Sequence, residues 1–335
     1  MFNRHPMKNN ALLVLGRLLK FLPFLLIMIT CKSNESFSSV ARSYLNEILS
    51  VMQTNSINRN TIDWDKFKQN VFAHAINAQT IADTYNAISY ALISLGDHHS
   101  FYITSKGGYL YNNPPVTCGG STQPDVTLPD SVGYIRIAAF APSPQSADAV
   151  QFAQSMQNTI KSRDRSYLKG WLVDLRGNSG GDMWPMITGV GPIVGAGVLG
   201  YFIDSYGHSS TWTYNSGTSS LNGSNMTTVT TPYTLINPQL KVAVLIDCLT
   251  ASSGEAVAVA FEGRPYTKFF GASPSCGLST ANQAYSLSDG AQLYLTTAVD
   301  ADRNNVKYGN SIAPDVLTTS SADAVTAAIS WLFVK

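Results

Sequence analysis

The sequence predicts an α/β fold in which a bundle of helices precedes a core of alternating strands and helices. Apolar residues recur at helical spacing from 38 to 95, which favours the bundle. Short apolar strands then alternate with helices from 132 onward, which is typical of an α/β core. A loop rich in Pro, Gly and Asn, at 107–129, separates the two regions. We therefore expect a helical N-terminal bundle over 36–105 and a core over 130–335.

Three periodic apolar runs predict three helices in the bundle, and their apolar side chains are best explained as the core of the bundle itself. In the core we expect the following elements in order: a strand at 132–140, a helix around 149–160, strands at 170–175 and 241–246, a helix at 252–261, strands at 267–271 and 293–299, and a closing helix at 320–333 capped by Ser320 or Ser321. The Ser/Thr/Asn/Gly-rich stretch 205–232 predicts an exposed β arm or the rim of a site.

Composition excludes several function classes. The chain has 335 residues, of which 44% are hydrophobic, enough for one large core or two modest ones. Only 13% are charged and the formal net charge is +1, so we expect no nucleic-acid partner.

The N-terminus is typical of an export signal. Basic residues precede an apolar run at 21–30 that is short for a membrane span. Cys31 follows this run, in a context that loosely resembles a bacterial lipoprotein cleavage box. We expect residues 1–31 to be a signal peptide or lipoprotein signal. The protein would then be exported, and either anchored to a membrane through a lipidated Cys31 or simply cleaved and released in the periplasm or outside the cell.

Cysteine usage allows at most one internal disulfide after processing, because Cys118, Cys248 and Cys276 are then left. The chain has no CxxC pair and no His/Cys cluster with metal-ligand spacing, so we expect no metal site.

A serine stands where a strand is expected to turn into a helix. The strand at 241–246 is followed by the motif TASSGE at 250–255, which contains Ser252 and Ser253. A helix N-terminus offers positive potential and unpaired N–H groups, which favour a nucleophile and an oxyanion. Taken alone, however, the serine is better explained as an ordinary N-cap.

A second motif changes that interpretation. The strand at 170–175 leads into DLRGNSGG at 174–181, a glycine-rich turn that can aim backbone N–H groups at one point. These two motifs resemble those of the carboxy-terminal processing (tail-specific) serine peptidases and of the tricorn core protease. The segments VGYIRI at 132–137, GASPSCGLST at 271–280 and IAPD at 312–315 are similar to further landmarks of that family.

The resemblance runs from about 95 to 315 and implies a core of the crotonase/ClpP-like type. It implies Ser252 as the nucleophile, with Ser253 beside it. It also implies an oxyanion site formed by the backbone N–H groups of Gly180 or Gly181 and of Ser253. The reaction would be acyl transfer to serine followed by hydrolysis of peptides or unfolded protein segments, without a cofactor.

The general base is expected to be a histidine. Lysine-type relatives carry their base about 25 residues after the nucleophile, where this chain has Gly277, and Lys268 lies too early. The segment LGDHHS at 95–100 resembles the motif of the histidine-type branch and implies His99 as the base, with His98 as the alternative. A His-His pair at a helix end is otherwise more often a cap.

The third catalytic member departs from the family pattern. Histidine-type relatives place a glutamate at the position of Tyr308, and no glutamate follows Gly263. We expect Asp302 to be the group that orients His99. A role as a turn residue, or in an ion pair with Arg303 or Lys307, would explain Asp302 equally well.

Many members of the family that this chain resembles insert a PDZ domain between the histidine motif and the strand at 132. Only residues 103–131 lie there in this chain, far too few for a PDZ domain. We therefore expect no recognition of a substrate's C-terminal carboxylate by such a domain. Two other functions stay open: a catalytically silent protein that binds apolar ligands or peptides, and an esterase acting on small acyl groups.

Overall fold

The computed structural model describes residues 37–111 and 127–334, which belong to one compact unit. The predicted signal segment 1–31, including Cys31, lies outside the described residues, and so does Cys118. The division between bundle and core stays a prediction.

The N-terminal helices begin and end at residues suited to those positions. They are α1 (Ser39–Asn55), α2 (Trp64–Ala73), the short 3₁₀ helix η1 (Ala82–Thr84) and α3 (Tyr85–Leu95). The side chains of Ser38 and Asp63 accept hydrogen bonds from the first turns of α1 and α2. Helix α3 ends at Gly96, whose left-handed backbone, with φ of +69°, is favourable for glycine because glycine has no Cβ.

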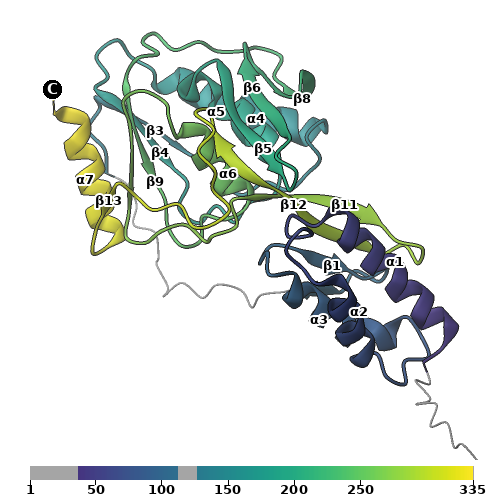
Figure 1. Ribbon diagram of the computed structural model, residues 1–335. Coiled ribbons are helices and arrows are strands. Elements are labelled where there is room, and N and C mark those ends of the chain that lie inside the picture. Colours follow the sequence, from purple (N-terminus) through teal and green to yellow (C-terminus); the bar gives the residue numbers. More distant parts are fainter. Residues whose placement is uncertain (1–36, 112–126, 335) are drawn as a thin grey trace, which may run out of the picture. The chain divides into compact units, whose positions relative to one another are not determined.

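A parallel sheet carries the helices of the core on both faces. Its strands are β3 (Val132–Arg136), β4 (Gly170–Asp174), β9 (Lys241–Leu245), β10 (Thr267–Gly271) and β13 (Val316–Leu317), in the order β13-β10-β9-β4-β3. Helices α4 (Ala147–Arg163), α5 (Met183–Val194) and α6 (Ser253–Phe261) pack on one face. Helix α7 (Ser321–Phe333) covers the other face (Figure 1). Both faces of these strands are therefore buried, as their continuous apolar runs require.

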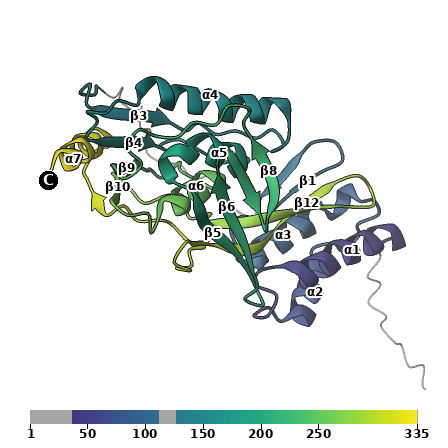
Figure 2. The same ribbon diagram turned by 90° about the horizontal axis from the view of Figure 1, so that it is seen from above.

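An antiparallel sheet connects the bundle to the core. Its strands are β1 (Phe101–Ile103), β2 (Tyr109–Tyr111), β5 (Gly197–Asp204), β6 (Ser209–Asn215), β7 (Thr218–Leu221), β8 (Ser224–Thr228), β11 (Thr280–Ser286) and β12 (Gln292–Asp302). The first part of β12 pairs with β1 and its last part pairs with β5. Helices α1 and α3 lie beside β12 in Figure 2, and their apolar faces share one cluster with Leu293 and Leu295 of this strand.

Helix α5 and strand β5 were not expected from the sequence. Every residue of α5 is buried, so the helix has no polar face and no amphipathic period. Its glycines and prolines look like helix breakers, but close packing explains the glycines: a Cβ on Gly191 would lie 2.1 Å from the ring of Tyr214. Tertiary packing has overridden local propensity here.

Three further observations concern the described residues only. None of their helices is long and apolar enough to cross a membrane. They contain no group of three or more potential metal ligands. Cys248 takes part in a disulfide, whereas Cys276 is a free thiol.

Candidate active site

Ser252 occupies a strained turn between β9 and α6. It is the N-cap of α6, with φ of +53° and ψ of −120°. A residue with a side chain rarely adopts this conformation, which costs about 1–3 kcal/mol and clusters at active sites. The predicted helix begins one residue later than expected, at Ser253, and Ser252 is the last residue of the loop that leads from β9 into it.

The glycine-rich turn after β4 is bonded directly to the serine loop. The Ala251 amide donates to the Asn178 carbonyl over 2.9 Å. The Ser253 hydroxyl donates to the Gly181 carbonyl over 2.8 Å, so the hydroxyl of the second candidate nucleophile is already engaged. A Cβ on Gly180 would lie 2.8 Å from the Ser252 Cβ, which shows how closely the two loops approach.

The three predicted oxyanion donors differ in their availability. The Gly180 amide donates to the Asn178 side chain over 3.0 Å and is therefore used within the turn. The amides of Gly181 and Ser253 have no acceptor among the described residues. Two unpaired N–H groups thus remain beside the serine, as an oxyanion site requires.

His99 lies between the end of α3 and β1. Its amide donates to the Asp97 carboxylate over 2.9 Å, and its carbonyl accepts from the Asn282 side chain over 2.9 Å. Its ring nitrogen Nδ1 lies 2.7 Å from the Thr280 hydroxyl, which leaves Nε2 free of a protein partner in the described residues. Burial lowers the pKa of His99 to about 4, against a smaller opposing effect of Asp97. The ring is therefore neutral at physiological pH.

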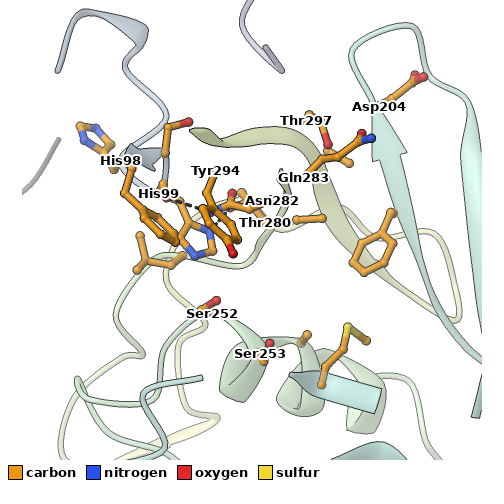
Figure 3. Close-up of a pocket in the computed structure, with 18 of the residues that line it drawn as sticks. His98, His99, Asp204, Ser252, Ser253, Thr280, Asn282, Gln283, Tyr294 and Thr297 are labelled. Carbon is orange, nitrogen blue, oxygen red and sulfur yellow. Dashed lines mark hydrogen bonds between the residues drawn. The ribbon is translucent and has the colours of Figure 1, made fainter. Parts of the chain in front are cut away.

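One cavity of about 1590 Å³ is lined by five of the candidate residues. Ser252, Ser253, Gly181, His98 and His99 all line it. Figure 3 shows the Ser252 side chain and the His99 ring on opposite sides of this opening, facing each other. Two segments that are 153 residues apart in the sequence (252 − 99) thus meet at one opening.

The other histidines are placed differently. His98 lies at the cavity with a left-handed backbone, at φ of +62°. His74 is bonded to the Asn70 carbonyl and stacked on Tyr90, and His208 pairs with Asp204 at an exposed site.

Asp302 is not brought to His99 by any hydrogen bond. Its Oδ1 accepts from the amides of Asn304 and Val306, at 2.8 and 2.9 Å, and it does not line the cavity. This is the geometry of the turn residue that we had considered as the alternative. The structure gives His99 a different partner, Thr280, which sequence reasoning missed because no local pattern links two residues that are 181 positions apart.

Glu255 has a structural role that the motif alone did not reveal. Its side chain is fully buried and accepts four hydrogen bonds: from the Ser252 amide at 3.0 Å, the Ser275 hydroxyl at 2.5 Å, the Gly277 amide at 2.9 Å and the Leu278 amide at 2.7 Å. Burial raises the pKa of Glu255, and these four donors oppose that effect. The carboxylate therefore fixes the backbone of Ser252 to the loop that precedes β11. Gly277, at the position of the lysine in other relatives, is part of this arrangement.

Comparison with known proteins relates this chain to peptidases. A family model described as Peptidase family S41 matches residues 131–318. A nisin-resistance protein from Lactococcus lactis subsp. lactis is 33% identical over 281 residues, which cover 81% of this chain and 80% of that protein.

Solved structures share the fold. A lipoprotein from Streptococcus agalactiae superposes with a TM-score of 0.67 at 23% identity, and the match covers 88% of this chain and 96% of that one. A photosystem II D1 C-terminal processing protease gives a TM-score of 0.54 at 16% identity, covering 88% of this chain and all of that one. The α/β fold class predicted from the sequence, a helical bundle with a peptidase core, is confirmed.

Proposed function

Since the chain belongs to peptidase family S41 and is a serine-type peptidase, we propose that Ser252 is its nucleophile and His99 its general base. The observation that carries this proposal is that both side chains face one cavity, beside the unpaired amides of Gly181 and Ser253. The strained backbone of Ser252 is a second, independent support, because ordinary N-caps have extended backbones.

In the proposed reaction the two side chains first come within hydrogen-bond reach of each other, because no hydrogen bond joins them in the described structure. Nε2 of neutral His99 takes the proton of the Ser252 hydroxyl as its oxygen attacks the scissile carbonyl carbon. The C–N bond then breaks, and the imidazolium returns the proton to the leaving amine. Water, activated by the same imidazole, attacks the acyl-enzyme and releases the second product.

Two groups assist these steps in the proposal. The amides of Gly181 and Ser253 stabilise the negative oxygen of each tetrahedral intermediate, which is commonly worth about 3–4 kcal/mol per donor. Thr280 has the orienting role that the sequence suggested for Asp302: in the tautomer that leaves Nε2 free to accept a proton, Nδ1–H donates to the Thr280 hydroxyl.

The substrate is a peptide or an unfolded protein segment. The cavity is larger than most small-molecule sites, and it extends well beyond the serine. The 33% identity to a nisin-resistance protein makes the peptide nisin a specific candidate substrate.

Export is part of the proposal. A basic segment followed by an apolar run and Cys31 is typical of an export signal, and the similar Streptococcus agalactiae structure is named a lipoprotein. We propose an exported bacterial enzyme, with membrane attachment through lipidated Cys31 as one form of it.

A fluorophosphonate probe tests the nucleophile directly. Wild type and Ser253→Ala should be labelled, whereas Ser252→Ala should not and His99→Ala should react much more slowly. Labelling that persists in Ser252→Ala would reject the assignment, and no labelling of wild type would favour the silent binding protein.

Product analysis then separates the substrate classes. Nisin and an unfolded protein are incubated with wild type and Ser252→Ala, and fragments are identified by mass spectrometry. We expect fragments with wild type only. Turnover of small esters without cleavage of either substrate would favour the esterase.

A further inference from the structure

Three aromatic side chains form a row across neighbouring strands on the cavity side of the antiparallel sheet. Phe101 of β1 is paired in register with Tyr111 of β2 and with Tyr294 of β12. The rings of Phe101 and Tyr294 are 4.5 Å apart and almost parallel, and that of Tyr111 follows at 6.1 Å from Phe101. We call Tyr111, Phe101 and Tyr294 the aromatic row.

The fold does not need this row for its core. Residues alternate between the two faces of a strand, and the residues next to the row, Tyr102, Leu293 and Leu295, are the ones buried against the bundle helices. Tyr111 is 56% exposed, and all three rings of the row line the cavity. An exposed apolar cluster of this kind typically marks a binding surface.

The row lies next to the proposed catalytic residues. His99 precedes Phe101 by two residues, immediately before β1, and both side chains line the cavity. Figure 3 shows Tyr294 and His99 on the same side of the opening, across from Ser252. A side chain bound on the row would therefore belong to a substrate residue close to the scissile bond.

The chemistry of the row decides which side chain fits. The rings of Phe101 and Tyr294 are stacked and that of Tyr111 is tilted by 33° to Phe101, so the three together line the cavity with a continuous aromatic surface. Another aromatic ring buries a large apolar area on such a surface and can pack against it in offset-stacked or edge-to-face geometry, whereas a lysine would lose part of the hydration of its ammonium group.

We propose that the aromatic row is a specificity subsite that binds an aromatic side chain of the peptide substrate near the bond that is cleaved. The proposal rests on the proposed function of Ser252 and His99. It is independent of which peptide is the natural substrate.

A set of peptides that differ at one position, as Phe, Leu, Ala or Lys, tests the subsite. The varied position is moved along the peptide so that each residue around the cleaved bond is sampled. At one of these positions wild type should cleave the Phe peptide with kcat/KM at least tenfold above that of the Ala peptide, and the Lys peptide should be the poorest. Tyr294→Ala should remove this preference mainly through KM, whereas Tyr294→Phe should keep it.

Tyr206→Ala is the matched control, because Tyr206 is an exposed aromatic residue that lines the same cavity outside the row. This variant should keep the Phe over Ala ratio. Equal ratios in wild type and Tyr294→Ala, or a preference for Lys, would overturn the subsite. Absence of all cleavage and of probe labelling in wild type would instead count against the proposed function.

Discussion

Replacing Glu255 should loosen the nucleophile and destabilise the fold at the same time. The carboxylate accepts four hydrogen bonds in a fully buried position, and one of the donors is the amide of Ser252 itself. Substitution by Ala leaves all four donors without their acceptor. Substitution by Gln keeps one acceptor oxygen and puts an NH₂ group against two donors.

The expected magnitudes follow from these contacts. A buried donor left without an acceptor costs about 1–3 kcal/mol, but Ser252, Gly277 and Leu278 line the cavity, where water can reach their amides. Counting each of the four lost hydrogen bonds at the low end of this range, about 1 kcal/mol, Glu255→Ala should lower the free energy of unfolding by about 4 kcal/mol. Glu255→Gln, which loses two bonds, should lower it by about 2 kcal/mol.

Denaturant unfolding followed by tryptophan fluorescence measures the stability, and the rate of fluorophosphonate labelling measures the nucleophile. Glu262→Gln is the control: Glu262 follows the same helix, burial raises its pKa to about 7, and its side chain has no hydrogen bond among the described residues. The control should stay within about 0.5 kcal/mol of wild type and keep the labelling rate. A Glu255→Gln variant that matched wild type in both measurements would refute the role given to this carboxylate.

Three more predictions concern the base, the turn and the third member. Because burial lowers the pKa of His99 to about 4, kcat/KM should be constant from pH 8 to 6 and fall only as pH drops through about 4, where the imidazole becomes protonated; a midpoint near 6.5 would contradict this. Gly180→Ala, whose Cβ would press on the nucleophile, should abolish probe labelling, whereas Gly195→Ala, with a similar positive φ but open space around it, should only lower stability. Thr280→Val should reduce kcat by about 10- to 100-fold, whereas Thr280→Ser should keep the activity of wild type. Asp302→Ala should lower stability but not specific activity. A loss of kcat in Asp302→Ala together with unchanged kcat in Thr280→Val would instead favour Asp302 as the group that orients His99.

Local signals allowed much of the core to be predicted from the sequence. The strand at 267–271 has the expected bounds, and the strand at 170–174 ends one residue earlier than expected. These segments are short apolar runs bounded by glycine or by a polar turn, and both features are visible without knowledge of the fold. Helix α5 was not predicted because it lacks such a local signal. It is buried on all sides, so it has no amphipathic pattern, and neighbouring side chains leave no room for a Cβ at its glycines, which in a sequence look like turn residues.

The candidate site could be predicted only where a motif follows a recognisable buried strand. Ser252 and the glycine turn each stand at the end of a buried strand, so their positions could be inferred from the chain alone. The contact of His99 with Thr280 depends on the register between β11 and β12 and on the placement of the bundle, neither of which leaves a local pattern. The choice of Asp302 as the orienting group stays a prediction; in the described structure its carboxylate accepts from the amides of Asn304 and Val306 and has no hydrogen bond to His99.

The distribution of buried acids fits the proposed site, in which a hydroxyl and not an acid lies against Nδ1 of His99. Glu255 and Asp300 are both fully buried. Neither oxygen of Asp300 has a partner in the described residues, and burial, with the charge of Glu255, raises its pKa well above the usual range. Glu255 has four donors and holds the backbone of the serine.

His99, in contrast, has only the neutral hydroxyl of Thr280 against Nδ1, which is consistent with its low pKa. A weakly basic imidazole gains less energy when it takes the serine proton, so more of the catalytic stabilisation must come from the oxyanion amides. Their alignment depends on the serine loop and hence on Glu255. In the proposed site the acid Glu255 therefore acts on Ser252 and on the oxyanion amides through the backbone, while the orientation of His99 depends on a hydroxyl.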